Sequence, residues 1–141
     1  MEGRTTKHCD SLVARMKSVK NKTEVDGMRR CQLRDGAAVV RYLAWLDEQV
    51  NAAEVDPTLN EYTGALKSEE FRSEGEHYRG LSFGTISSIG PNGAVIHYEP
   101  SEATALPLNN QQVYLLDSGA QYMDGTTDTT RTVHFSQPTA H

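Results

Sequence analysis

Residues 113–135 read VYLLDSGAQYMDGTTDTTRTVHF, and this stretch decides the fold of the 141-residue chain. The apolar run Val113–Asp117 predicts a short strand that ends in a carboxylate. The run Thr127–Phe135 is rich in threonine and valine and predicts a second strand. A turn dipeptide, Asp124-Gly125, lies between them. The stretch therefore predicts an antiparallel hairpin with one aspartate near the inner end of each arm.

These two aspartates are candidate metal ligands. Asp117 ends the first strand and Asp128 opens the second. A carboxylate at a buried strand end is costly unless it is paired or bound to a metal. Two facing carboxylates repel unless a cation lies between them, and such oxygen-rich sites suit Mn²⁺, Mg²⁺ or Ca²⁺. The alternative is turn chemistry, in which aspartate side chains accept hydrogen bonds from backbone N–H groups.

The register of the hairpin decides whether the two aspartates can share an ion. Direct pairing of Asp117 with Asp128 requires a turn earlier than Asp124-Gly125. A tight turn at Asp124-Gly125 instead places Asp117 opposite Thr132, roughly 13 Å from Asp128 at ~3.3 Å per residue. Both registers keep the aspartates on one face. A shared metal then requires a bulge or a wider loop, so we predict an irregular hairpin.

Two helices are expected before the strands. Thr23 is a suitable N-cap for a helix over residues 23–49, with Asp26 at its third position. A second helix is expected to begin at Asp56-Pro57, where proline fits the first helical position, and to fade near residues 73–75. Residues 1–22 are polar and basic and predict an N-terminal tether.

Further strands are expected over residues 81–89 and 94–98, joined through the turn residues 90–93. Two long helices followed by a mostly antiparallel sheet indicate an α+β fold. His97 lies in the last of these strands. A single histidine on a strand is commonly structural, but this one could also donate to a substrate carbonyl or stabilise a tetrahedral intermediate.

The composition excludes several classes of protein. A net charge of −5 is a poor match to nucleic-acid binding, and no apolar run reaches the ~20 residues of a membrane span. We see no signal peptide. Two cysteines, Cys9 and Cys31, are too few for a disulfide framework and favour a reducing, cytoplasmic compartment. No Gly-x-Ser-x-Gly elbow and no phosphate-binding glycine loop is present.

Three segments together resemble a known family. They are KNKTEVDGMRRCQLRDGAA at 20–38, LSFGTISSIGPNGAVIHYEP at 81–100, and the hairpin at 113–135. In this order and spacing they resemble the aminopeptidase P branch of the pita-bread metallopeptidases, most closely the cytosolic X-prolyl aminopeptidases of eukaryotes. The resemblance covers about residues 14–140.

The resemblance implies a site with two divalent metal ions, usually Mn²⁺. Its ligands would be two aspartates, one histidine and two glutamates. Asp117 would chelate one ion, Asp128 would bridge both, and His97 would contact the substrate near the scissile bond. The other ligands belong to a later half of the fold. Residues 23–141 would then be the first half of a partial pita-bread catalytic domain, with the second half absent.

The implied activity is metal-dependent removal of the N-terminal residue from peptides with a penultimate proline. We expect the chain alone to be inactive, because it carries two of five ligands. Unpaired edges and exposed apolar surface should favour a homo-oligomer. The alternatives are a catalytically inactive pita-bread module for protein binding and an α+β domain without metal.

Overall fold

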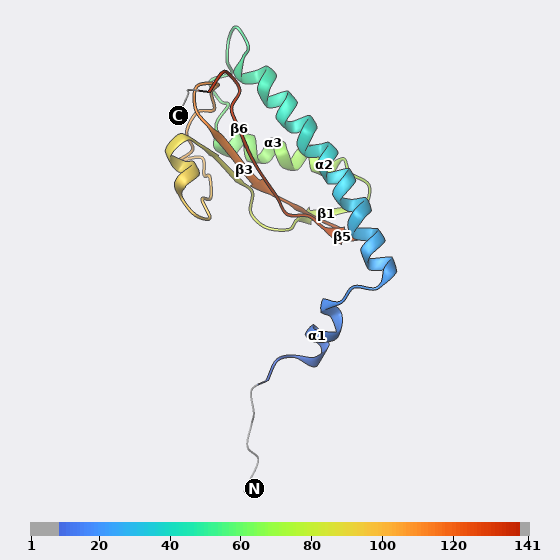
Figure 1. The fold of residues 1–141 in the computed structure, drawn as a ribbon. Helices are drawn as coiled ribbons and strands as arrows, with labels where there is room; N and C mark the ends of the chain where they lie inside the picture. Colours follow the sequence, from blue (N-terminus) through green and yellow to red (C-terminus); the bar gives the residue numbers. More distant parts are fainter. Residues whose placement is uncertain (1–8, 139–141) are drawn as a thin grey trace, which may run out of the picture.

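The computed structural model describes residues 9–138, so the ends of the predicted tether and of the predicted catalytic segment lie outside it. Its first element is a short helix, α1 (Leu12–Ser18), with Ser11 as N-cap. No residue of α1 is buried. Figure 1 shows α1 standing apart from the rest of the chain, below the N-terminal end of the next helix.

The first long helix is α2 (Lys22–Val50), close to the predicted range. Its N-cap is Asn21, so the prediction of Thr23 is wrong. The Asn21 side chain accepts a hydrogen bond from the Glu24 backbone N–H at 3.0 Å, and the Glu24 carboxylate accepts one from the Asn21 N–H at 2.9 Å. This reciprocal box forms because asparagine caps better than threonine and glutamate suits the third position better than aspartate.

The second long helix is α3 (Glu61–Ser73), and it begins later than predicted. Its N-cap is Asn60, which forms a capping box with Thr63. The predicted start at Asp56 is wrong, because the Asp56 carboxylate caps a separate turn by accepting a hydrogen bond from the Thr58 N–H at 2.8 Å. Both helix starts were therefore misplaced by a competing polar residue nearby.

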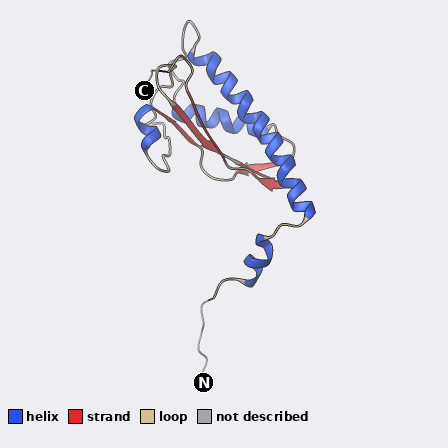
Figure 2. Ribbon diagram, viewed as in Figure 1, coloured by secondary structure: helices blue, strands red, loops and turns tan. Residues whose placement is uncertain are grey.

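The strands form two antiparallel sheets of three strands each. One sheet has the order β2 (Ile86–Ile89), β3 (Tyr114–Ser118), β6 (Thr129–Val133). The other has the order β1 (Tyr78–Leu81), β4 (Ala120–Tyr122), β5 (Gly125–Thr126). Figures 1 and 2 show α2 along one side of the strands. The predicted α+β class is confirmed, with two small sheets where one was expected.

The predicted strand over 81–89 is split between the two sheets. Leu81 pairs with Ala120 of β4, whereas Ile86 pairs with Asp117 of β3. Between them the Ser82 N–H donates to the Gly119 carbonyl at 3.2 Å. The chain therefore passes from one sheet to the other near Ser82. The neighbouring segment passes between the same two sheets at Gly119, between β3 and β4.

The predicted strand over 94–98 is wrong. Residues Gly90–Ala94 form a 3₁₀ turn, η1, and the chain then continues as a loop in which the Tyr98 N–H donates to the Val95 carbonyl at 3.2 Å. The physical reason lies on α3, where the buried Glu61 carboxylate binds side chains from this loop. These contacts draw the segment away from β2, which would have been its partner.

The main core lies between α2, α3 and the β2-β3-β6 sheet. Leu46 of α2 and Leu116 of β3 are both fully buried, and a buried leucine contributes about 1.5–3 kcal/mol. The hydroxyls of Tyr42 and Tyr114 form a hydrogen bond of 2.8 Å within this core, and Ser87 completes the group at 2.9 Å from Tyr114. The inward side of β3 is thus fixed, which leaves Asp117 on the outward side.

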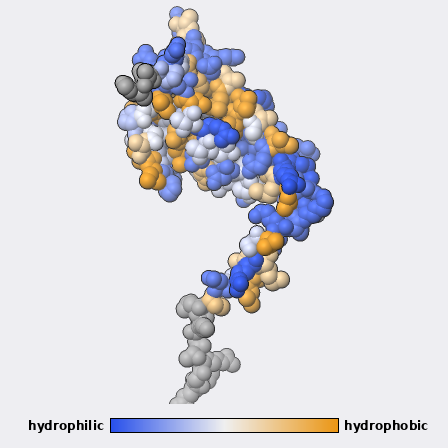
Figure 3. All heavy atoms as spheres, in the orientation of Figure 1, coloured by the Kyte–Doolittle hydropathy of each residue, from blue (hydrophilic) through white to orange (hydrophobic). Residues whose placement is uncertain are grey.

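Both cysteines are free thiols, Cys31 buried and Cys9 exposed. Within residues 9–138, no helix is both long enough and apolar enough to cross a membrane. Figure 3 shows hydrophobic residues along α1 and over the strands, whereas hydrophilic residues gather on the N-terminal half of α2.

Candidate metal and substrate site

The hairpin has a register that differs from both predicted ones. Asp117 lies opposite Thr130 in the β3–β6 pair, two residues from Asp128. Tyr122 lies opposite Gly125, so the turn consists of residues 123–124. One register runs through both pairs, and no bulge separates Asp117 from the turn. The expected bulge or wider loop is therefore wrong, although the hairpin is irregular as predicted, because both strands are interrupted at residues 119 and 127–128.

Tertiary contacts with α2 explain this turn. The Asp124 carboxylate accepts a hydrogen bond from Arg34 and lies 3.6 Å from Arg30. These guanidinium groups hold the pKa of Asp124 below its usual value, chiefly through the Arg34 hydrogen bond. The next residue, Gly125, packs on α2 so closely that a Cβ there would lie 2.5 Å from the Cys31 sulfur. The turn therefore docks where Asp124 can reach the arginines.

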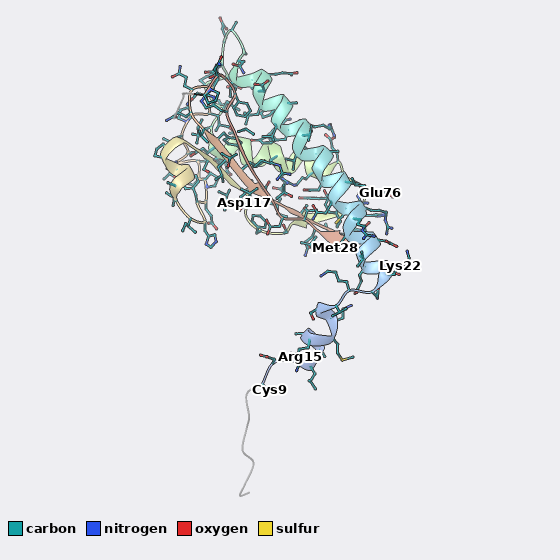
Figure 4. All side chains as sticks on the ribbon, viewed as in Figure 1. Cys9, Arg15, Lys22, Met28, Glu76 and Asp117 are labelled. Atoms are coloured by element: carbon teal, nitrogen blue, oxygen red, sulfur yellow. The ribbon has the colours of Figure 1, made fainter. Side chains whose placement is uncertain are left out.

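The register predicts that Asp117 and Asp128 lie near each other. Extending the alternation of β6 back from Thr130, through the interruption at residues 127–128, assigns Asp128 to the face that carries Asp117. Diagonal neighbours of this kind have Cα atoms about 7–8 Å apart. Asp117 is half-buried and Asp128 is exposed. Figure 4 labels Asp117 on β3, in the middle of the folded part of the chain.

Asp117 has an unsatisfied oxygen. Its Oδ1 atom is buried and has no hydrogen-bond partner within residues 9–138. A buried acceptor without a partner costs about 1–3 kcal/mol, and more when it is charged. A divalent cation would satisfy such an atom, so Asp117 and Asp128 fit the carboxylate part of a metal site. No cluster of three or more His, Cys, Asp or Glu suited to a metal occurs in the described part.

The strands are held tightly together between the two aspartates. A Cβ at Gly119 would lie 2.0 Å from the Thr127 carbonyl oxygen. The same carbonyl accepts a hydrogen bond from the Ser82 hydroxyl at 2.8 Å, and the Thr127 hydroxyl accepts one from the Ala120 N–H at 2.9 Å. Sequence reasoning missed these positioning residues, although a glycine directly after a strand is a signal for close backbone approach.

His97 lies on the loop after η1 and is exposed. Its backbone has a φ of 55°, in the left-handed region that few non-glycine residues adopt. The side chain lines a hollow of about 150 Å³, together with Phe83, Gly84, Ile86 and Glu99. Ile86 lies directly opposite Asp117 in the β2–β3 pair. One residue that lines the hollow is therefore a direct cross-strand neighbour of Asp117. No hydrogen bond joins His97 to either aspartate in the described region.

Comparisons with known proteins agree on one family. The model of metallopeptidase family M24 matches residues 26–141. The chain is 56% identical over 129 residues to a protein called probable Xaa-Pro aminopeptidase P from Laccaria bicolor, covering 92% of the chain and 20% of that protein. It is 49% identical to Aminopeptidase P1 from Lotus japonicus, covering 93% and 23%. The chain thus spans about a fifth of the length of the curated relatives it matches.

Solved structures agree. The X-prolyl aminopeptidase from Caenorhabditis elegans, described as a cytosolic enzyme with a di-nuclear active site, superposes with a TM-score of 0.85 at 43% identity, covering 92% of the chain and 21% of that structure. Aminopeptidase P from Escherichia coli, in its His350Ala form, gives 0.69 at 25% identity, covering 92% and 27%. The predicted partial pita-bread fold is therefore confirmed, with the chain covering about a quarter or less of these two structures.

Proposed function

Since the chain belongs to metallopeptidase family M24, we propose that it forms the first half of the catalytic domain of an X-Pro aminopeptidase. The substrates would be peptides with a penultimate proline, from which the N-terminal residue is removed. The names of the relatives support this reaction. The observation that carries the proposal is the buried Oδ1 atom of Asp117, which has no hydrogen-bond partner among residues 9–138, on the face to which the register assigns Asp128.

Asp117 and Asp128 would hold divalent metal ions, and we propose Mn²⁺. Bound in pairs, such ions polarise the scissile carbonyl and lower the pKa of water. The chain's own contribution is to fix the two carboxylates on adjacent strands, through the close contact of Gly119 with Thr127. Two carboxylates are an incomplete set for two ions, so the remaining ligands would come from a second half of the domain.

His97 would contact a substrate bound in the hollow. It is exposed, it lines the same hollow as Ile86, and Ile86 is the cross-strand neighbour of Asp117. From there the imidazole could donate a hydrogen bond to the carbonyl oxygen of the bond to be cleaved. Phe83 and Ile86 give the hollow an apolar side suited to a proline ring.

The proposal extends to location and assembly. The Caenorhabditis elegans relative is described as cytosolic, and we propose a cytoplasmic location here too. In the described part, β2 and β6 each have one strand neighbour, so each leaves one edge unpaired. Open edges pair readily with further chain, and we propose a homo-oligomer. The alternative of an inactive binding module is disfavoured because Asp117, Asp128 and His97 are all retained.

The test is a calorimetric titration of the chain with MnCl₂. The wild-type chain is expected to release or take up heat on binding, and the double variant Asp117→Asn, Asp128→Asn to lose this signal. Glu102→Gln is the matched control, because Glu102 is an exposed carboxylate on the loop after η1. Equal heats from the wild type and the double variant would show that the aspartates are not ligands.

A second measurement concerns activity. The chain alone is expected to give no hydrolysis of an X-Pro peptide with Mn²⁺ present, because its ligand set is incomplete. A protein that joins the chain to a second half from a relative is expected to cleave the peptide, and the double variant of that protein to be inactive. A measurable rate from the isolated chain would contradict the incomplete site.

A further inference from the structure

We propose that Glu61 is a positioning residue for His97. The Glu61 side chain projects from α3, and its carboxylate accepts hydrogen bonds from residues before and after this histidine. The inference rests on the proposed function only for the role of His97; the control of the loop by Glu61 stands on contacts within the chain.

Glu61 is fully buried, at the first position of α3. Its Oε1 atom accepts hydrogen bonds from the Ile89 N–H at 2.7 Å and from the Asn92 side chain at 3.2 Å. Its Oε2 atom accepts from the Tyr98 hydroxyl at 2.7 Å, the Leu106 N–H at 2.8 Å and the Asn92 side chain at 3.0 Å. Every donor comes from the segment between the end of β2 and the loop before β3.

Buried charges are usually paired, but the Glu61 carboxylate forms no salt bridge within residues 9–138. Neutral donors and the amino end of α3 stabilise its charge instead. Glu61 also donates its backbone N–H to the Leu106 carbonyl at 3.0 Å. Burying the Glu61 carboxylate costs desolvation free energy, and the hydrogen bonds that it accepts fix the path of the loop.

The contacts close around His97. Asn92 precedes it and Tyr98 follows it, and their side chains are hydrogen-bonded to each other at 3.0 Å as well as to Glu61. His97 itself keeps a left-handed backbone and is exposed. A conformation of this kind persists only when its surroundings over-determine it. The Glu61 carboxylate supplies that constraint, since it fixes the residues on both sides.

The test compares two buried carboxylates of the same chain. Glu61→Gln keeps the size of the side chain but replaces one acceptor oxygen by an NH₂ group, so at least one buried donor loses its acceptor. Asp35→Asn is the matched control, because Asp35 is equally buried on α2 and contacts Arg72 and Tyr122, away from the loop. Both variants are compared with the wild type by amide hydrogen exchange and by NMR relaxation of the His97 ring.

In Glu61→Gln, exchange at the amides of 89–98 is expected to rise about tenfold more than at the β3 and β6 amides, as the loss of one hydrogen bond predicts. The order parameter of the His97 ring is expected to fall. In Asp35→Asn neither change should be specific to the loop. A rise that is uniform over the chain, or the same loop effect in Asp35→Asn, would overturn the proposal.

Tyr98→Phe keeps the test decisive if Glu61→Gln does not fold. It removes one donor and leaves the carboxylate and α3 unchanged. A smaller rise in exchange confined to the loop is expected, and an unchanged loop would overturn the proposal. The MnCl₂ titration of Tyr98→Phe separates the two hypotheses. Loss of loop order with normal Mn²⁺ binding supports the role of Glu61, whereas absent Mn²⁺ binding in the wild type would overturn only the proposed function.

Discussion

A buried carboxylate between α2, α3 and β4 is fully hydrogen-bonded, whereas one on the outward side of the β2-β3-β6 sheet is not. The first, Asp35, accepts hydrogen bonds from the Arg72 guanidinium at 2.8 and 3.3 Å and from the Tyr122 hydroxyl at 3.0 Å. On the outward side, the buried Oδ1 atom of Asp117 has no partner in the described region. The difference separates acids that hold the fold together from an acid that the fold leaves available for a ligand.

Asp35 and Asp117 also differ in what their burial costs in stability. A saturated carboxylate such as Asp35 is destabilising only when a partner is removed. An unsaturated one such as Asp117 carries this cost in the unliganded fold, and a bound cation would remove it. Four measurements test this difference between Asp35 and Asp117, in order of decreasing expected effect.

The largest effect is expected from Arg72→Met. Arg72 is fully buried, and its removal leaves the Asp35 carboxylate without its cation. We expect a loss of about 3–5 kcal/mol in the free energy of unfolding, measured by urea denaturation. Lys22→Met is the control, because the Lys22–Asp26 pair is exposed and should contribute less than about 0.5 kcal/mol. Equal losses of stability in Arg72→Met and Lys22→Met would show that the buried ion pair contributes no more to stability than the exposed one.

A smaller loss is expected from Gly119→Ala. The new Cβ would lie within 2.0 Å of the Thr127 carbonyl oxygen, so the strands that carry the aspartates must separate. Overpacking of this kind costs about 1–3 kcal/mol. Gly36→Ala is the matched control, since no atom lies within 4 Å of a Cβ there, and alanine should stabilise that helix by up to about 1 kcal/mol. Mn²⁺ binding should weaken in the first variant only.

High pH should destabilise the helix side. Burial raises the pKa of Tyr114 to about 12, and burial together with the Glu61 carboxylate raises the pKa of Tyr98 to about 12. A raised pKa means that folding favours the neutral phenol. This stability is complete below about pH 10 and is lost as the pH rises through about 12. Urea denaturation at several pH values measures the decline, and Tyr98→Phe should make it shallower.

The smallest effect is expected from Asp117→Asn without metal. No partner is lost and an unpartnered buried charge is removed, so the free energy of unfolding should stay the same or rise by up to about 1 kcal/mol. Asp35→Asn should be clearly less stable, because its ion pair with Arg72 is lost. Thermal unfolding in the presence of EDTA compares the two variants. A large loss in Asp117→Asn would reveal a structural role for this carboxylate and weaken its assignment as a metal ligand.

The sequence predicted the elements that depend on local patterns. The ranges of α2, β3 and β6 follow from residues close to one another, such as the apolar run that ends at Asp117. The helix starts were misplaced because Asn21 and Asn60 compete with Thr23 and Asp56 as caps, and composition alone does not decide between them.

The sequence could not predict features that depend on distant contacts. The register of the hairpin follows from Asp124 binding Arg34, 90 positions earlier in the chain. The loop at 94–98 follows from Glu61, 37 positions before Tyr98. Both candidate aspartates are predicted from their place on the strands, whereas Glu61 has no local pattern that distinguishes it from a surface glutamate at the start of a helix.

The docking of the 123–124 turn on α2 has a consequence for the outward side of the sheet. Moving a strand by one residue turns all of its side chains over. Such a shift would bury Asp117 in place of Leu116, and it would also carry Asp124 away from Arg34. The Arg34–Asp124 ion pair therefore disfavours a shifted register. A contact at the turn of the hairpin thus determines on which face of the sheet Asp117 lies.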